Sequence, residues 1–343
     1  MRMLNLTADR AAAADLPETV IVCHDVRNPA DRAQVLVRKG SPINAEMITS
    51  LLERGAAELH LAVPDPDDVD ENAAATRLAR TVGGSGVTSG QANFGQTNLV
   101  SEERGMLRVS AARLDRLNAC EGVLVLTGEA DRPVDAGTTL GVVKCAPLFL
   151  AEATLVEVEN VVRDDGPVLE IEAFQPHRVA LVAPRERLRG GAFDRAQAAL
   201  GSALDWYGSS LDQVVGADAS VEAMAAAYHT VRHGGAELIF AAGAAGTDPL
   251  DVVFEGLRHA GGEVIQLGIP AEPGTACWIG SLDGVGVLGL ASCELFGQPG
   301  ALDLLLPRLL TGEPLNQHLV RQLAYGGLLH GSTRIAPYHA ATG

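Results

Sequence analysis

Aromatic and basic residues are both scarce in this chain. Aromatic side chains make up 4% of its 343 residues, so the cores must be built mainly from Ala, Val and Leu. Lys and Arg number 26 against 43 Asp and Glu, which gives a formal net charge of −17. A surface with this charge repels nucleic-acid phosphates and anionic membranes, and it argues against general binding to either. Solubility is the simplest interpretation of the excess charge.

Cysteine pairs and long apolar runs are missing as well. No CxxC or CxxxC spacing occurs, which argues against a zinc knuckle and against a disulfide scaffold. No apolar stretch of about 18 residues is present, and "MRMLNLTADRAAAADLPETV" lacks a signal-peptide core. We therefore expect a cytoplasmic protein. The five cysteines are Cys23, Cys120, Cys145, Cys277 and Cys293.

Hydrophobic patterning divides the chain into four predicted parts. Residues 1–86 form an N-terminal α+β region, and residues 87–177 contain strand-like pieces that indicate a β-rich module. Over residues 178–315, apolar strands alternate with amphipathic helices, which predicts an α/β fold: a three-layer α/β/α domain with a mostly parallel sheet. Residues 316–343 form a less regular tail.

A loop of small residues follows one of the apolar strands in "IFAAGAAGTDPLDVV". Ligands of open α/β sheets bind beyond the carboxyl ends of the strands. A loop without bulky side chains lets backbone N–H groups approach an anion there, and the next helix adds a partial positive charge. Close packing of strand on helix is the alternative explanation. The loop lacks the sequence of a P-loop, and it consists of Gly243, Ala244, Ala245, Gly246 and Thr247.

Two aspartates, Asp248 and Asp251, stand at the start of the helix after this loop. Acidic residues in a first turn cap free N–H groups and complement the helix dipole. The same carboxylates could instead hold Mg²⁺, which commonly uses one or two carboxylates together with ligand phosphates. We predict Asp248 and Asp251 as the catalytic and metal-binding candidates. Helix capping by the same two residues remains the alternative.

Three further features are weaker candidates. Lys144 interrupts the apolar run "LGVVKCAPL", which suggests an anion-binding role, a salt bridge or a position at a strand edge. Ser292 and Cys293 follow a strand, where Cys293 is either a nucleophile or a small buried thiol. His229 and His233 are four residues apart on one predicted helix, and a solvated helix face explains them better than a metal site.

The loops of the last third share several motifs with one family. Asp248 and Asp251 follow the Gly-rich loop, a Gly-Gly-Glu precedes a strand at residues 261–263, a Pro-Gly loop lies at 273–274, and Gly289-Leu290 ends another strand. This pattern resembles the molybdopterin-binding domain shared by the MoeA- and MogA-type proteins of molybdenum cofactor biosynthesis. The upstream segments "FGQTNLVSEERGMLRVS" and "DAGTTLGVVKCAPLFL" are similar to those of a less-characterised MoeA-like branch.

The resemblance implies a cofactor-binding cleft and its residues. The loop at residues 243–247 would hold a terminal phosphate, while loops 272–275 and 291–294 would close over a pterin. Members of that branch often accompany a cofactor nucleotidyltransferase, and family members commonly form homo-oligomers. The residues that the resemblance adds to the predicted binding set are Pro273, Gly274, Ser292, Cys293, Lys144, Asn98 and Thr127.

Two departures from the family pattern bear on function. Ala291 and Ser292 replace the Pro-Gly of the family's Gly-Leu-Pro-Gly turn, and the first loop has neither of the family's usual forms. We therefore expect a protein that binds molybdopterin or the finished molybdenum cofactor, with Mg²⁺ supporting adenylyl transfer or molybdate insertion if it catalyses a reaction. A non-catalytic cofactor carrier or scaffold for a molybdoenzyme is one alternative. An unrelated small-molecule enzyme on the same fold is the other.

Overall fold

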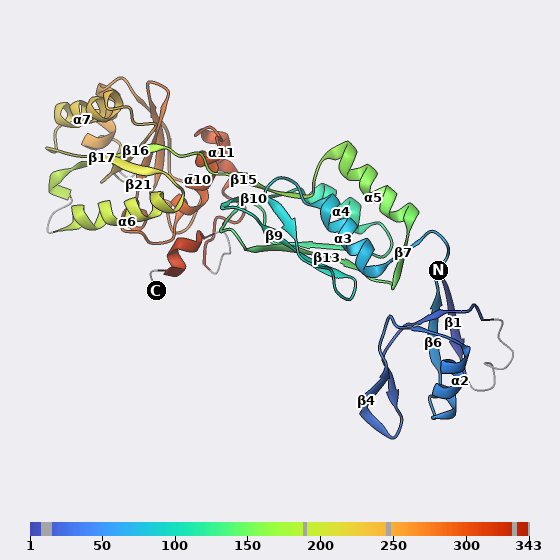
Figure 1. Cartoon of the computed structure of the whole chain (residues 1–343). Helices are drawn as coiled ribbons and strands as arrows, with labels where there is room; N and C mark the ends of the chain where they lie inside the picture. The colour runs from blue at the N-terminus through green and yellow to red at the C-terminus, as the bar shows by residue number, and fades with distance from the viewer. Residues whose placement is uncertain (8–15, 188–190, 245–247, 331–334, 342–343) are drawn as a thin grey trace. The chain divides into compact units, whose positions relative to one another are not determined.

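The computed structural model describes residues 1–7, 16–187, 191–244, 248–330 and 335–341 (Figure 1). The chain is a mixed α/β protein with several sheets, which confirms the predicted class at that level. It divides into two compact units whose segments interleave along the sequence. The first unit comprises Met1–Glu102, Val109–Gly128 and Thr139–Glu170, and the second comprises Glu103–Arg108, Glu129–Thr138 and Ile171–Gly343. The four predicted parts remain a prediction.

An antiparallel sheet and one helix build the N-terminal part of the first unit. The strand order is β1-β6-β2-β5. Helix α2 begins where the side chain of Asn44 caps it by accepting the N–H of Met47 at 2.9 Å. Its Ile48 and Leu51 are buried against the sheet. The elements are β1 (Arg2–Leu6), β2 (Val20–Val22), β3 (Val26–Asn28), β4 (Asp31–Val37), β5 (Pro42–Ile43), α2 (Ala45–Glu53) and β6 (Leu59–Val63).

The remainder of the first unit is a four-stranded sheet, ordered β11-β13-β9-β8, with helices packed against it. Arg77 of α3 joins two helices, since its Nη1 lies 2.7 Å from Glu152 and its Nε 2.5 Å from Glu159 of α5. The sequence analysis did not predict α5. The elements are β7 (Asp68–Asp70), α3 (Glu71–Val82), β8 (Val87–Ser89), β9 (Gln96–Ser101), α4 (Ala111–Asn118), β11 (Val123–Thr127), β13 (Thr139–Cys145), β14 (Phe149–Ala151) and α5 (Glu152–Asp165).

The second unit contains a six-stranded sheet ordered β17-β16-β18-β21-β20-β19. Strands β17, β16, β18 and β21 are mutually parallel, whereas β20 runs antiparallel to both of its neighbours. The elements are β16 (Arg178–Pro184), η1 (Arg185–Arg187), α6 (Ala192–Trp206), β17 (Ser210–Ala217), α7 (Val221–His233), β18 (Leu238–Ala242), α8 (Val252–His259), β19 (Glu263–Leu267), β20 (Trp278–Leu282), β21 (Val285–Leu290), α9 (Ser292–Leu295), α10 (Ala301–Leu310), α11 (Gln317–Gln322) and η2 (Pro337–Ala341).

Helices cover both faces of this sheet, as the alternation of strands and helices predicts. Along β16, Leu181 packs into a core with α6, α10 and α11, whereas Val182 packs into the opposite core with α7 and α8. Successive strand side chains point to opposite faces, so a near-continuous apolar strand is needed to fill both cores. The carboxyl ends of the four parallel strands therefore meet at one edge of the sheet.

A smaller sheet, ordered β12-β10-β15, holds most of its residues in the second unit. Its charged centre is Arg108, which lies 2.6 Å from Asp131, 2.6 Å from Glu172 and 2.7 Å from Glu313. Burial alone would lower the pKa of Arg108. The hydrogen bonds that Arg108 donates to these carboxylates outweigh the effect of burial, and the pKa of Arg108 is raised. The elements are β10 (Gly105–Val109), β12 (Arg132–Val134) and β15 (Leu169–Ala173).

Replacing Arg108 by methionine should lower the free energy of unfolding of the second unit by about 3 kcal/mol, because three carboxylates lose their shared cation. Urea titration measures this change. Arg258→Met serves as the control, since it removes an exposed pair with Glu255 on α8 and should cost about 0.5 kcal/mol or less. Equal effects of the two substitutions would contradict a structural role for the Arg108 cluster.

The C-terminal tail docks on the start of α10. Asp303 is buried and caps the helix by accepting the N–H of Gly300 at 2.9 Å. Its other oxygen accepts the Tyr338 hydroxyl at 3.2 Å and lies 2.7 Å from Nε2 of His339. The tail thus closes one end of the second unit's core. The homo-oligomer that the resemblance implies remains a prediction.

Candidate functional site

A cavity of about 310 Å³ lies at the carboxyl ends of β18 and β21 in the second unit. This is the edge of the sheet where the sequence places a ligand, and the volume suits a small molecule. The wall is mainly apolar, with one guanidinium group and one hydroxyl. Its residues are Arg187, Gly243, Ala244, Ala276, Leu290, Ala291, Ser292, Leu295 and Phe296.

Gly243 directly follows β18 and lines the cavity in a conformation that favours glycine. Its φ is +97°, and a Cβ atom at this position would lie 2.9 Å from Cδ of Arg187. The sequence predicts a small residue at this position, and the closeness of Arg187 is the reason that one is needed. Ala244 also lines the cavity. The predicted residues Ala245, Gly246 and Thr247 lie outside the described residues.

Arg187 is a site residue that the sequence analysis missed. It lies in the turn after β16, and its Nη1 donates to the carbonyl of Gly243 and lies 2.6 Å from Oδ2 of Asp251. Its side chain remains 36% exposed, which leaves part of the guanidinium facing the cavity. The signal was present in "PRERLRGG", where three arginines directly follow a buried strand at its carboxyl end.

Asp251 has the capping role that the sequence left open. It is the N-cap of α8, where its Oδ1 accepts the N–H of Val253 at 2.9 Å, and its Oδ2 pairs with Arg187. Both oxygens of this buried carboxylate are therefore engaged. Asp248 is exposed and accepts the N–H of Leu250 at 3.1 Å. The predicted catalytic roles of Asp248 and Asp251 remain predictions.

The described residues contain no cluster of metal-binding side chains. Among those residues, no group of three or more His, Cys, Asp or Glu has an arrangement that could hold a metal ion. His229 and His233 stand exposed on α7, with Nδ1 of His233 2.8 Å from the carbonyl of His229. The Mg²⁺ expectation for Asp248 and Asp251 therefore rests on the sequence alone.

The Pro273-Gly274 loop contributes to the packing beside the cavity rather than to its wall. Gly274 is buried with φ +122°, and a Cβ atom there would lie 2.6 Å from the nitrogen of Ala301 and 2.7 Å from Oε1 of Glu294. That same oxygen accepts the N–H of Ala301 at 3.1 Å. Glycine is needed here so that a buried carboxylate can cap α10. The neighbouring residue that does line the cavity is Ala276.

Ser292 and Cys293 begin the short helix α9, and Ser292 lines the cavity. Cys293 is half-buried with a free thiol, and it is not among the lining residues. Nearby Cys277 is also free but fully buried. Burial, followed by the charge of Glu294, raises the pKa of the Cys277 thiol far above its ordinary value. The two thiols therefore differ in access to solvent.

Iodoacetamide at pH 8 should label Cys293 at least about 10-fold faster than Cys277 in the folded protein, because the thiolate is the nucleophile. Cys145 should resist as well, since burial raises its pKa to about 11. Peptide mass spectrometry after timed quenching measures the labelling, and urea-unfolded protein supplies the control in which all sites react. Rapid labelling of Cys277 in the folded state would contradict its placement.

The upstream candidates Asn98, Thr127 and Lys144 belong to the first unit, whereas the cavity belongs to the second. On the four-stranded sheet, Lys144 pairs with Gln96 and Asn98 pairs with Val142, so Lys144 and Asn98 are exposed diagonal neighbours. Lys144 lies on an inner strand, because β13 pairs with β11 on one side and with β9 on the other, so the strand-edge alternative for Lys144 is wrong. Their predicted part in binding the cofactor remains a prediction.

The chain is thus a mixed α/β protein with a cavity at the carboxyl ends of a mostly parallel sheet. No family model matches the chain, and no curated protein matches it. Among solved structures it is similar to a molybdopterin biosynthesis MoeA protein from Pyrococcus horikosii, with 13% identity and a TM-score of 0.30 over 94% of this chain and 76% of that chain. Similarity at this level does not identify the residues of a site. No described helix has the length and apolar character needed to cross a membrane.

Proposed function

We propose that the protein binds a pterin phosphate, molybdopterin or the molybdenum cofactor, in the strand-end cavity and acts in the biosynthesis or delivery of that cofactor. The observation that carries the proposal is the pairing of Arg187 with Gly243 at the end of β18. This pairing sets a cation and a bare stretch of backbone at the place where the sequence motifs predict a phosphate.

The chemistry of the wall suits such a ligand. Ala276, Leu290, Leu295 and Phe296 offer an apolar surface to a flat heterocycle. The exposed part of Arg187 supplies donors for phosphate oxygens, since a guanidinium group matches phosphate geometry. A local cation of this kind can hold an anion even though the net charge of the chain is −17.

Carriage of the cofactor without catalysis is the second candidate, and the state of Asp251 favours it. This carboxylate caps α8 and pairs with Arg187, so each of its oxygens already has a structural partner among the described residues. Molybdate-dependent turnover with ATP would instead support a transferase. The molybdoenzyme and the nucleotidyltransferase expected from the resemblance are the recipients to test for a carrier.

The phosphate requirement tests the binding proposal. Isothermal titration with molybdopterin should show that Arg187→Gln weakens binding by about 10-fold, the loss of one charge-assisted contact. A dephosphorylated pterin should bind the native chain and the variant equally. Arg258→Gln removes one exposed positive charge elsewhere and should leave the affinity unchanged. Equal molybdopterin affinity in the native chain and Arg187→Gln would refute the assignment.

A further inference from the structure

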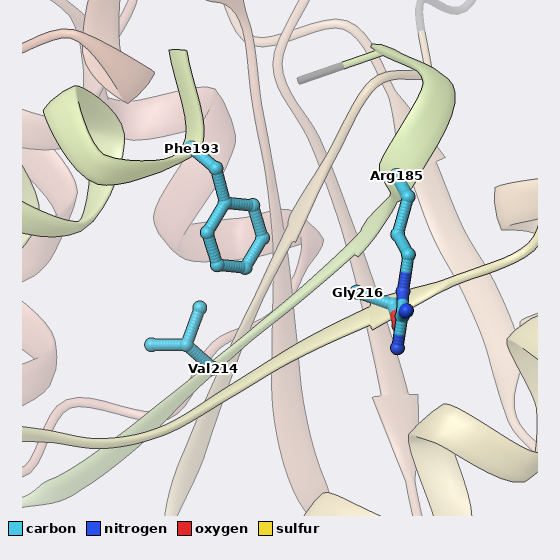
Figure 2. Close-up of a pocket in the computed structure, with 4 residues that line it drawn as sticks. All are labelled: Arg185, Phe193, Val214 and Gly216. Carbon is cyan, nitrogen blue, oxygen red and sulfur yellow. The ribbon is translucent and has the colours of Figure 1, made fainter. Parts of the chain in front are cut away.

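A second cavity of about 350 Å³ lies beside β17 and the start of α6. Its lining comprises Arg185, Phe193, Val214 and Gly216 (Figure 2). Val214 and Gly216 are two residues apart on the edge strand β17, so they face the same side of the sheet. Val214 packs against the core on the α6 face, which places the cavity on that face.

Arg185 lies across the end of β17. Its Nε donates to the carbonyl of Gly216 at 2.6 Å. A Cβ atom on Gly216 would lie 2.8 Å from Cγ of Arg185, so the bare backbone of Gly216 makes room for the arginine. This hydrogen bond fixes the guanidinium and leaves its two terminal nitrogens available.

The charge of Arg185 is uncompensated in the described part of the chain. Arg178, at the start of β16, pairs with Asp212, and Arg187 pairs with Asp251. Arg185 has no carboxylate within ion-pair distance among the residues that the structure describes. An oriented guanidinium with free terminal nitrogens is well suited to bind a carboxylate or a phosphate.

The rest of the lining is apolar. Phe193, in the first turn of α6, lies on the Val214 side of the cavity, and Arg185 extends beside Gly216 (Figure 2). Both Phe193 and Val214 are half-buried, so part of each remains available to a ligand. An aromatic ring beside an aliphatic side chain favours contact with a flat ring.

We propose that this second cavity binds a small molecule that joins a flat ring to one anionic group. The ring packs between Phe193 and Val214, and the anion pairs with the terminal nitrogens of Arg185. The site is distinct from the strand-end cavity, and its occupancy does not depend on molybdopterin binding there. The anion is either a carboxylate on an aromatic ring or the phosphate of a mononucleotide, because both share this chemistry.

Isothermal titration with 2-naphthoate and with AMP tests the proposal on the full chain. At least one of them should bind with a Kd below about 1 mM. Adenosine, which lacks the anion, and inorganic phosphate, which lacks the ring, should each bind at least about 10-fold more weakly. Preference for AMP or for 2-naphthoate identifies the anion as phosphate or carboxylate. Absence of binding for both would overturn the proposal.

Variants locate the bound probe. Arg185→Gln should weaken binding of the preferred probe by about 10-fold, and Phe193→Leu by about 3-fold. Gly216→Ala should act like Arg185→Gln, because the added methyl group displaces the arginine. Arg258→Gln controls for the lost charge, and unchanged thermal unfolding excludes a folding defect. Full affinity in both Arg185→Gln and Phe193→Leu would place the probe elsewhere and refute the site.

Discussion

Gly289→Ala is expected to lower the free energy of unfolding of the second unit by about 3 kcal/mol or more, at the upper end of the losses that overpacking a core causes. Gly289 lies in β21 directly opposite Trp278 of β20. A Cβ atom on Gly289 would fall inside the indole ring of Trp278, which is fully buried between the helices and the sheet. Neither the backbone of a central strand nor the ring has room to move.

Urea unfolding followed by tryptophan fluorescence measures this effect, since both tryptophans, Trp206 and Trp278, belong to the second unit. Gly286→Ala is the matched control in the same strand, where the nearest atom to a Cβ is the flexible end of Leu315 at 3.1 Å. That change should cost about 1 kcal/mol or less. Comparable stability of the Gly289 and Gly286 variants would contradict the packing described here.

A double substitution separates the clash from other causes. Trp278→Leu alone should destabilise the chain by about 3 kcal/mol, because it leaves a cavity. Combined with Gly289→Ala, it should cost clearly less than the sum of the two single changes, since the methyl group then fills part of the space. Additive costs would show that Gly289 is required for a different reason.

Gly243→Ala is expected to weaken molybdopterin binding by at least about 10-fold. Alanine disfavours the φ of +97° at this position, and its methyl group would lie 2.9 Å from Cδ of Arg187. The arginine must then leave its place at the end of β18. Fluorescence titration with molybdopterin measures the loss of affinity.

Gly261→Ala is the matched control for backbone strain. Gly261 has φ +86° in the turn after α8, and a Cβ atom there would meet no neighbour within 4 Å. This variant should lose about 1 kcal/mol of stability and keep its affinity for molybdopterin. If the two glycine variants lost affinity equally, the effect would come from stability and not from the cavity.

Elements set by local chemistry could be predicted from the sequence. Asn44 caps α2, and the turn at Asp283-Gly284 joins β20 to β21 with positive φ at both residues. Alternate side chains of β16 and of β18 pack into the cores on the two faces of the sheet. The nearly continuous apolar sequence of each strand indicates that both of its faces are buried. Helix α5 escaped prediction, since only Leu155, Val158 and Val161 of its residues are buried and the apolar stripe is narrow.

The candidate site was predicted in place but not in its contacts. The sequence placed a ligand beyond β18, and a cavity is found there, lined by Gly243, Ala244 and Ser292. It could not show that Asp251 pairs with Arg187, because that pair joins residues 64 positions apart. Nor could it show that Gly274 makes room for Glu294. Such roles depend on long-range packing, which a single sequence pattern does not encode.

Release of bound pterin tests the central claim most directly. The chain is purified from a host that makes molybdopterin, then denatured, and the released small molecules are oxidised and assayed by fluorescence. We expect the native chain and Gly261→Ala to release pterin and Gly243→Ala to release little. Absence of pterin from the native chain, together with failure to bind added molybdopterin, would contradict the proposed function.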